Sequence, residues 1–504
     1  MPMAELILAL DQGTTGSTAA FFRADTLTMP GNCKVEFPQH YPKPGWVEHD
    51  PEEIWRSMTA AIDAAWAAAQ RSDASLRLAD VRAIGITNQR ETIVAWNRRT
   101  GETAGRALVW QDRRTADFCA HLAGDEAVAR RIRESTGLVI DPYFSASKMH
   151  WILAHYPQVK GWALNGELAL GTIDAWLIYR LTGGAAFVTE HTNASRTMLY
   201  SLEQGGYDPE LARIFGVPLA ALPEVRPSVG TFGVTRGVPQ LPDGIPITGC
   251  LGDQQAALFG QGCERAGEGK ITYGTGAFFL MNTGAEPVFS ARGLLTSVAF
   301  SEGAGRTFAL EGSTFIAGAA VQFLRDNFGW FTRADESESL ALSEPRDPGV
   351  LFIPALAGLG APYWNPHARG ALFGLTRGTS RAQITRAVLE SITLQIVQLV
   401  RVMQESFTHP IIRLGVDGGA ARSDLMMQLQ SDLLRVRLVR PANIETTSLG
   451  AARAALRGID PAHVPPATTG AREFEPRMPA DEAATIVSAW TRAAEAVHGF
   501  YRPA

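Results

Sequence analysis

Near the middle of the chain stands Ile247-Thr248-Gly249-Cys250-Leu251-Gly252-Asp253-Gln254-Gln255-Ala256-Ala257-Leu258-Phe259-Gly260. This order predicts a short buried strand, a glycine turn and then a helix that starts at Asp253. An Asp between a glycine and a helix is most often the N-cap, whose carboxylate accepts a hydrogen bond from the first turn. The alternative is that the carboxylate of Asp253 faces a cleft and acts as a base. Both interpretations stay open on this stretch alone.

Two glycine-bearing hairpins lie on either side of that stretch. The first runs over 6–22 and has a polar turn at residues 11–16, the first tip. The second runs over 270–281 and has its turn at residues 274–276, the second tip. Backbone N–H groups and threonine hydroxyls at such a turn can bind an anion, and a carboxylate beside them can hold magnesium, although a plain hairpin turn is equally consistent. The repetition predicts a duplicated α/β fold whose ligand lies between the halves, near strand ends.

The remaining pattern alternates strands with helices. Asp50, Pro51 and Glu53 predict a helix start with an N-cap, a first-turn proline and a capping-box glutamate. Later, the apolar run 412–416 predicts a strand that ends at the glycine pair 418–419. Two glycines let the backbone approach something flat, as a nucleoside would be, and a tight strand-to-helix turn is the structural alternative.

Adjacent Arg90 and Glu91 follow a predicted strand at 84–87 and offer hydrogen-bond donors and acceptors together. Trp110 and Tyr143 stand in two later loops, each beside polar side chains. A small polyol needs aromatic rings for its C–H face and directed hydrogen bonds for its hydroxyls. The four residues therefore favour a polyol site, while a surface ion pair and two core aromatics remain the structural alternatives.

Composition narrows the class of protein. The chain has 504 residues, 46% of them apolar and 19% charged, which is enough for two or three domains with full cores. A net charge of −5 without a run of Lys and Arg argues against a nucleic-acid partner. The four cysteines form no C-x-x-C pair and the histidines no H-E-x-x-H, so reduced thiols in a cytoplasmic protein fit best. We expect neither a signal peptide nor a membrane span.

Eight motifs together resemble the FGGY carbohydrate kinases over about residues 6–457. They are Leu10-Asp11-Gln12-Gly13-Thr14-Thr15, Gly85-Ile86-Thr87-Asn88-Gln89-Arg90-Glu91-Thr92, Trp110-Gln111-Asp112, Thr192-Asn193-Ala194-Ser195-Arg196-Thr197, Gly252-Asp253-Gln254-Gln255, Tyr273-Gly274-Thr275-Gly276, Ala361-Pro362-Tyr363-Trp364 and Gly370-Ala371-Leu372-Phe373-Gly374-Leu375-Thr376-Arg377-Gly378. The resemblance implies an α/β fold of two actin-like, ribonuclease-H-like domains with the active site in the cleft between them. We expect the first domain to span residues 1–260 and the second residues 261–504.

The resemblance also implies that ATP and Mg²⁺ are bound. Asp11 and Asp253 match the family residues whose carboxylates face the metal. The residues that match the nucleotide site are Thr14, Thr15, Gly16, Thr275, Gly318, Gln322, Gly419 and Ser423.

The substrate that the resemblance implies is glycerol. The matching substrate residues are Arg90, Glu91, Trp110, Tyr143, Asp253, Gln254 and Phe278. Asp253 would then be the catalytic base that accepts the proton of the 3-hydroxyl as this oxygen attacks the γ-phosphate of ATP. The products would be sn-glycerol 3-phosphate and ADP, the entry step of glycerol catabolism.

This chain departs from the family pattern in four places. The first tip of the family continues with two serines and an arginine, whereas Gly16, Ser17 and Thr18 follow here, so we expect one positive contact to the nucleotide phosphates to be missing. A family asparagine near the adenine falls on Ser423. Residues 234–239 lack the loop that binds fructose 1,6-bisphosphate in relatives, and residues 228–232 lack the histidine that others phosphorylate. We expect neither kind of control.

Two rival functions remain. A kinase for a longer polyol or ketose, such as erythritol or xylulose, would clash with Arg90, Glu91 and Tyr143 or leave them unpaired. An actin-like or chaperone-like ATPase would turn over ATP without any polyol. The family resemblance further implies a homodimer or homotetramer.

Overall fold

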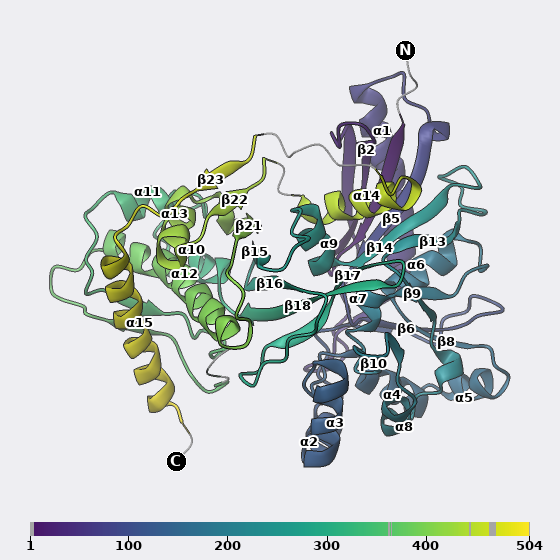
Figure 1. The fold of residues 1–504 in the computed structure, drawn as a ribbon, viewed down its shortest axis with the longest axis horizontal. Coiled ribbons are helices and arrows are strands. Elements are labelled where there is room, and N and C mark those ends of the chain that lie inside the picture. The colour runs from purple at the N-terminus through teal and green to yellow at the C-terminus, as the bar shows by residue number, and fades with distance from the viewer. Residues whose placement is uncertain (1–4, 361–362, 364, 443–444, 463–469, 503–504) are drawn as a thin grey trace.

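The structure, a computed structural model, describes residues 5–360, 363, 365–442, 445–462 and 470–502. Three residues of the motif at 361–364, namely Ala361, Pro362 and Trp364, lie outside the described residues. The chain forms strands and helices in alternation, with the N-terminal strands at one end of a long central sheet and a group of C-terminal helices at the other (Figure 1).

The central sheet repeats one strand order twice. In the first half the order is β14 (Pro246–Gly252), β5 (Val81–Asn88), β1 (Leu6–Gln12), β2 (Gly16–Arg23) and β3 (Gly31–Glu36). In the second half it is β22 (Leu438–Arg440), β21 (Arg413–Asp417), β15 (Glu268–Tyr273), β16 (Ala277–Gly284) and β18 (Gly305–Thr314). In each half a hairpin meander of three antiparallel strands is extended by parallel strands. The expected duplicated α/β fold is therefore confirmed.

The two halves meet edge to edge through two further strands. These are β13 (Val229–Val234), beside β14, and β17 (Leu295–Glu302), beside β18. The strands β13 and β17 pair in parallel where Val229 stands opposite Glu302. A last short strand, β23 (Arg472–Phe474), closes the sheet beside β22. The junction between the halves is thus narrow.

Helices cover both faces of the first half. Strand β1 is apolar on both sides, as expected of a central strand buried between two layers. Its Leu6, Leu8 and Leu10 pack with the apolar stripe of α1 (Pro51–Ser72). Ile7 and Ala9 point to the opposite face and pack with α14 (Thr446–Ile459). Residues of α14 come from the second half of the sequence, yet the helix lies against the strands of the first half (Figure 1).

The start of α1 agrees with the sequence only in part. Asp50 is the N-cap and accepts a hydrogen bond from the N–H of Glu52 at 2.8 Å, as predicted. The predicted capping box is wrong, because the carboxylate of Glu53 instead lies 2.8 Å from Nε2 of His40. A tertiary partner has replaced the local backbone contact.

A smaller layer lies beside the first half. Its sheet has the order β4 (Glu48–His49), β7 (Ala107–Leu108), β6 (Ile93–Asn97) and β8 (Leu168–Thr172). The helices of this part of the chain are α2 (Ala116–Ala123), α3 (Glu126–Thr136), α4 (Ser145–His155), α5 (Pro157–Leu164), α6 (Ile173–Leu181), α7 (His191–Ala194) and α8 (Pro209–Phe215). Most of them gather at the bottom of Figure 1. This layer carries the loops of Trp110 and Tyr143.

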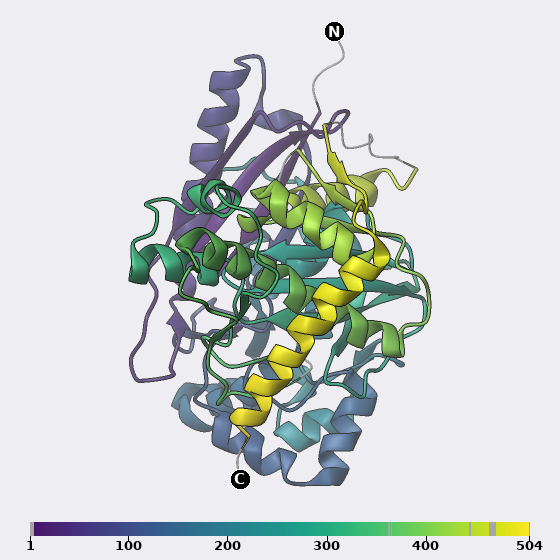
Figure 2. The ribbon, with the colours of Figure 1, turned by 90° about the vertical axis from the view of Figure 1, so that its left-hand side faces the viewer.

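The helices of the second half form their own core. They are α10 (Gly318–Phe328), α11 (Glu336–Leu342), α12 (Arg381–Ser406), α13 (Asp424–Leu434) and α15 (Ala480–Phe500). Trp490 of α15 is buried and donates to the backbone oxygen of Phe352 at 2.9 Å. Figure 2 shows α15, in yellow, running diagonally across this end of the molecule. Among the described helices, none combines the length and the apolar character needed to cross a membrane.

Glycines let α14 approach the first half closely. A Cβ atom on Gly85 of β5 would lie 2.0 Å from the backbone oxygen of Ala451, and one on Gly450 would lie 1.8 Å from that of Ala256. Real Cβ atoms do not come this close to backbone, so any side chain here would push the helix away. The position of α14 therefore depends on residues without side chains.

We predict that Gly85→Ala lowers the free energy of unfolding by about 1–3 kcal/mol, the usual cost of overpacking a well-packed contact. Gly161→Ala is the control, because a Cβ on Gly161 of α5 meets nothing within 4 Å. There the exchange should stabilise by about 0.5–1 kcal/mol, since alanine is the better helix former. Urea unfolding of both variants checks this, and equal midpoints would contradict the close packing of α14.

Candidate active site

Both tips are built in the same way. In the first, the N–H of Gly13 donates to the oxygen of Gly16 at 2.9 Å, and in the second the N–H of Gly274 donates to the oxygen of Gly276 at 2.9 Å. Thr15 and Thr275 are exposed and Thr14 is half-buried. The first half therefore presents two threonine hydroxyls, and the second half one, on a closed turn between its first two strands.

The first tip contacts the aromatic loop. Nε1 of Trp110 donates to Oγ1 of Thr14 at 3.0 Å. The ring of Trp110 meets that of Tyr143 edge to face, with centroids 5.6 Å apart. The structure thus brings a predicted phosphate contact and two predicted substrate aromatics together.

Phe278 lies on the sheet rather than in that cluster. It stands opposite Thr272 on β15 and opposite Ser313 on β18, and directly opposite residues of neighbouring strands share a face. Two positions along, Leu280 stands opposite both Lys270 and Glu311. Phe278 therefore shares its face of the sheet with Lys270 and Glu311.

Arg90 and Glu91 are buried, with side chains 2% exposed, so the surface ion pair is wrong. The Nη1 and Nη2 atoms of Arg90 each donate at 2.8 Å to one oxygen of Glu311 on β18. Glu91 accepts from Nε of Arg196 at 2.6 Å. Its backbone has a positive φ of 61°, which is uncommon for a residue with a side chain and points to a site that constrains it.

Burial and the neighbouring arginines shift the pKa values of the two acids of this cluster in opposite directions. Burial pushes the pKa of Glu311 up, but Arg196 and Arg90 outweigh burial and hold that pKa at about 2. Burial raises the pKa of Glu91, against the opposing effect of Arg196 and Arg90. Charges enclosed in this way are stable only with complementary partners in good geometry. The pairing of Arg90 with Glu311 supplies that geometry.

Asp253 is the first residue of α9 (Asp253–Gly260), and Gly252 occupies the N-cap position without a side-chain bond. The interpretation of Asp253 as N-cap is therefore wrong, although its carboxylate does accept from the N–H of Gln254 at 2.6 Å. The same carboxylate lies 3.3 Å from Nε of Arg90 and keeps 32% of its side chain exposed. Burial raises the pKa of Asp253, while Arg90 and Lys270 oppose that shift. The carboxylate of Asp253 therefore stays accessible beside the buried Arg90.

Gln254 points to the second half. Nζ of Lys270, a buried lysine on β15, donates to its side-chain oxygen and, at 2.7 Å, to Oγ1 of Thr272. Burial lowers the pKa of Lys270, and Asp417 and Asp253 oppose the shift. The side chain of Gln254 is therefore held by a hydrogen bond from Lys270.

Of the remaining predicted nucleotide residues, Gly318 and Gly419 lie beside the second tip. The N–H of Gly318, at the start of α10, donates to the oxygen of Gly274 at 2.9 Å. Gln322 follows one turn later and is exposed. Gly419 lies just past β21, where its neighbour Gly418 approaches the backbone of Tyr273 so closely that a Cβ would lie 2.4 Å from the oxygen of Tyr273. Ser423 has a structural task as the N-cap of α13, accepting from Met426 at 3.1 Å.

A metal site fits Asp11 and Asp253. Burial raises the pKa of Asp11 to about 7, and the negative charges of Asp253 and Glu445 add to that shift. The described residues contain no group of three or more His, Cys, Asp or Glu side chains arranged for a metal ion. Mg²⁺ needs no such group, because it is commonly held by one or two carboxylates together with water and substrate phosphates. The donor set therefore suits Mg²⁺ that arrives with a nucleotide.

Sequence reasoning missed Glu311, Arg196 and Lys34. Arg196 belongs to the motif at residues 192–197 but had no assigned role. Glu311 directly follows the apolar run 308–310 in β18, and an acid after an apolar run is a signal for a buried pair. Lys34 on β3 donates from Nζ to Oγ1 of Thr15 at 3.3 Å. Nothing in its local sequence singled it out.

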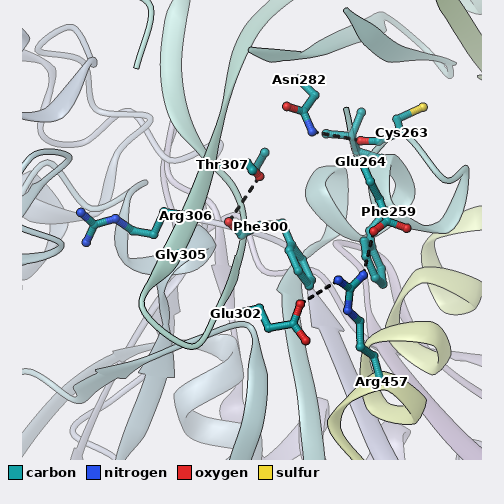
Figure 3. Close-up of a pocket in the computed structure, with 12 residues that line it drawn as sticks. Phe259, Cys263, Glu264, Asn282, Phe300, Glu302, Gly305, Arg306, Thr307 and Arg457 are labelled. Carbon is teal, nitrogen blue, oxygen red and sulfur yellow. Dashed lines mark hydrogen bonds and ion pairs between the residues drawn. The ribbon is translucent and has the colours of Figure 1, made fainter. Parts of the chain in front are cut away.

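A cavity of about 280 Å³ lies at the far end of α9 from Asp253 (Figure 3). The stacked rings of Phe259 and Phe300 line it, with centroids 4.5 Å apart, and Arg457 pairs with Glu264 and Glu302 at 2.7 Å each. None of the predicted site residues lines this cavity. It is separate from the cluster around Asp253.

Comparison with known proteins agrees with the family that the sequence motifs resemble. The FGGY family of carbohydrate kinases matches with its N-terminal domain at residues 6–260 and with its C-terminal domain at residues 269–459. A glycerol kinase of Myxococcus xanthus is 49% identical over 502 residues, covering 98% of this chain and 100% of the relative. A glycerol kinase of Symbiobacterium thermophilum is 50% identical over 498 residues, covering 98% of each.

Solved structures share the fold. The glycerol kinase of Plasmodium falciparum with ADP superposes with a TM-score of 0.91 at 32% identity, covering 98% of each chain. A sugar kinase from Brucella ovis, 22% identical, superposes with a TM-score of 0.85 over 98% of this chain and 100% of its own, and shows the fold alone. With both family domains matched in order along a duplicated α/β fold, the chain belongs to the FGGY family of carbohydrate kinases.

Proposed function

We propose that this protein transfers the γ-phosphate of ATP to glycerol, giving sn-glycerol 3-phosphate and ADP. The observation that carries the proposal is the placement of the accessible carboxylate of Asp253 3.3 Å from Nε of the buried Arg90. The names of the relatives, glycerol kinases at 49% and 50% identity, support glycerol as the acceptor. The ADP in the Plasmodium falciparum structure supports ATP as the donor.

The residues around Asp253 support a short polyol as the acceptor. Arg90 and Glu91 provide a donor and an acceptor for neighbouring hydroxyls, and the edge-to-face pair of Trp110 and Tyr143 provides an apolar wall. A site that pairs each hydroxyl rejects analogues by leaving buried polar groups unpaired. We infer that this set selects glycerol over erythritol and xylulose.

The catalytic task of the protein is alignment and proton transfer. Asp253 accepts the proton of the 3-hydroxyl as that oxygen forms its bond to phosphorus, and Arg90 and Glu91 fix which hydroxyl points at Asp253. The N–H groups and hydroxyls of the two tips bind the phosphates from both halves. When bound, magnesium ATP supplies the phosphoryl group and the metal neutralises phosphate charge. Asp11 and Asp253 are the residues of this chain that would hold the metal.

Several further features belong to the same proposal. We place the domain boundary between residues 260 and 261, with α14 as the element of the second domain that packs on the first. A homodimer or homotetramer, a place in the cytoplasm, and freedom from control by fructose 1,6-bisphosphate or phosphohistidine follow from the family pattern and remain predictions.

The direct test is release of ADP from magnesium ATP with different acceptors. We expect turnover to require glycerol and to yield glycerol 3-phosphate, because only an acceptor that pairs with Arg90 and Glu91 is aligned for attack. Erythritol, xylulose and dihydroxyacetone are the comparison acceptors. Preference for another acceptor would overturn the substrate, and ADP release without any acceptor would favour the ATPase alternative.

We predict that Asp253→Asn lowers kcat by roughly 10²–10⁴, the usual contribution of general-base catalysis, with nucleotide binding retained. Asp481→Asn is the control, since Asp481 also lies in the first turn of a helix but on α15, far along the chain from the site. Steady-state kinetics and calorimetric titration of the nucleotide check both variants. Near-normal turnover of Asp253→Asn would leave Asp253 with a structural role only.

A further inference from the structure

The first tip carries a cation that the sequence pattern did not assign. Lys34 lies on β3, away from the tip in sequence, and its Nζ donates to Oγ1 of Thr15 at 3.3 Å. Thr15 is exposed at the end of the turn, where a phosphate would bind. An ammonium group has three donors, so the bond to Thr15 leaves donors for a ligand.

The strand register places Lys34 on the face of the sheet that carries Asp11. Asp11 on β1 stands directly opposite Thr18 on β2, and Thr18 stands directly opposite Lys34 on β3. Directly opposite residues point to the same face, so the three form one row across the hairpin meander. Thr18, in the middle, is short and leaves the lysine side chain free to extend toward the tip.

Gly16 leaves the space through which the side chain of Lys34 reaches Thr15. A Cβ atom on Gly16 would lie 2.7 Å from Cε of Lys34, closer than a Cβ atom normally approaches a non-bonded atom. Any larger residue at position 16 would therefore displace the lysine from Thr15. The three positions fit one another. Glycine at 16 and the short threonine at 18 leave the space that the side chain of Lys34 occupies.

The chemistry at this position suits a phosphate. The turn presents backbone N–H groups and two threonine hydroxyls, which bind an anion without neutralising its charge. A lysine ammonium adds a full positive charge and is a standard phosphate partner. The family pattern places its arginine at position 18 itself. Lys34 stands directly opposite Thr18 and so restores a charge that Thr18 lacks.

We propose that Lys34 binds a phosphate of the nucleotide at the first tip, in place of a cation at residue 18. The identity of the ligand as ATP rests on the proposed function. The placement of a cation beside Thr15 rests on the structure and is independent of the proposed function. Lys34 thus makes up for the contact that the sequence pattern led us to expect to be missing.

The test compares Lys34→Gln with the double variant Lys34→Gln, Thr18→Arg. We expect Lys34→Gln to weaken binding of magnesium ATP about 10-fold, at the low end for a charge-assisted hydrogen bond because Lys34 is exposed and screened by solvent. Adding Thr18→Arg should bring the affinity back to within about threefold of the original, because an arginine at 18 restores one phosphate contact of this charge-assisted kind. Glycerol KM should stay unchanged in both.

Calorimetric titration of magnesium ATP without glycerol is the first readout, and KM for ATP is the second. Lys160→Gln on α5 is the control, because it removes an exposed lysine remote in the fold from the first tip. An unchanged affinity in Lys34→Gln would overturn the proposal, and so would a loss that Thr18→Arg does not rescue.

The titration also separates this inference from the proposed function. A protein that binds ATP through Lys34 but phosphorylates an acceptor other than glycerol would support the inference and overturn the substrate. A protein that phosphorylates glycerol with the same ATP affinity in Lys34→Gln would do the reverse.

Discussion

Glu311 holds both terminal nitrogens of Arg90 at 2.8 Å in a place where each side chain is at most 3% exposed. Arg90 follows β5 in the first half, and Glu311 lies on β18 in the second. A buried charge that loses its partner costs several kcal/mol, about 3–5 in measured cases. The halves can therefore part here only at a considerable cost. The pair with Glu311 therefore keeps the two halves close together. It also fixes the orientation of the Arg90 side chain and its contact with Asp253.

The duplicated fold explains why such a contact is possible. Each half contributes a closed turn after its first strand, and the same strand order puts both turns at corresponding ends of their strands. The junction of β13 with β17 is narrow, whereas α14 binds the second half's chain tightly to the first half's sheet. Glycines such as Gly85 and Gly450 make that tight contact possible. The two halves are thus joined by the firm packing of α14 and by the narrow junction of β13 with β17. This construction suits a molecule whose halves close on a substrate.

The sequence predicted local structure well because local structure depends on local pattern. Apolar runs gave β1, β5 and β15, and the helix at Asp253 begins where it was expected. The N-cap role of Asp253 was wrong because the helix follows the strand directly and Gly252 takes the cap position. Glu311 and Lys34 could not be assigned, since both act through tertiary contacts: Lys34 reaches Thr15 across the hairpin meander, and Glu311 reaches Arg90 from the other half of the fold. The capping box at Glu53 failed for the same reason, as His40 competes for its carboxylate.

The role of the pair between Arg90 and Glu311 is tested most directly by acceptor discrimination in Glu311→Gln. The matched control is Glu390→Gln, because buried Glu390 also holds an arginine through two bonds, to Arg346 at 2.7 and 3.0 Å, in the helical core of the second half. The measured quantity is kcat/KM for glycerol divided by that for propane-1,2-diol, which lacks one hydroxyl. If Glu311 aims Arg90 at the substrate, this ratio falls by about 30-fold in Glu311→Gln, the low end for losing one partner of a buried charge pair, and is unchanged in Glu390→Gln. An unchanged ratio in a folded Glu311→Gln protein would contradict the account.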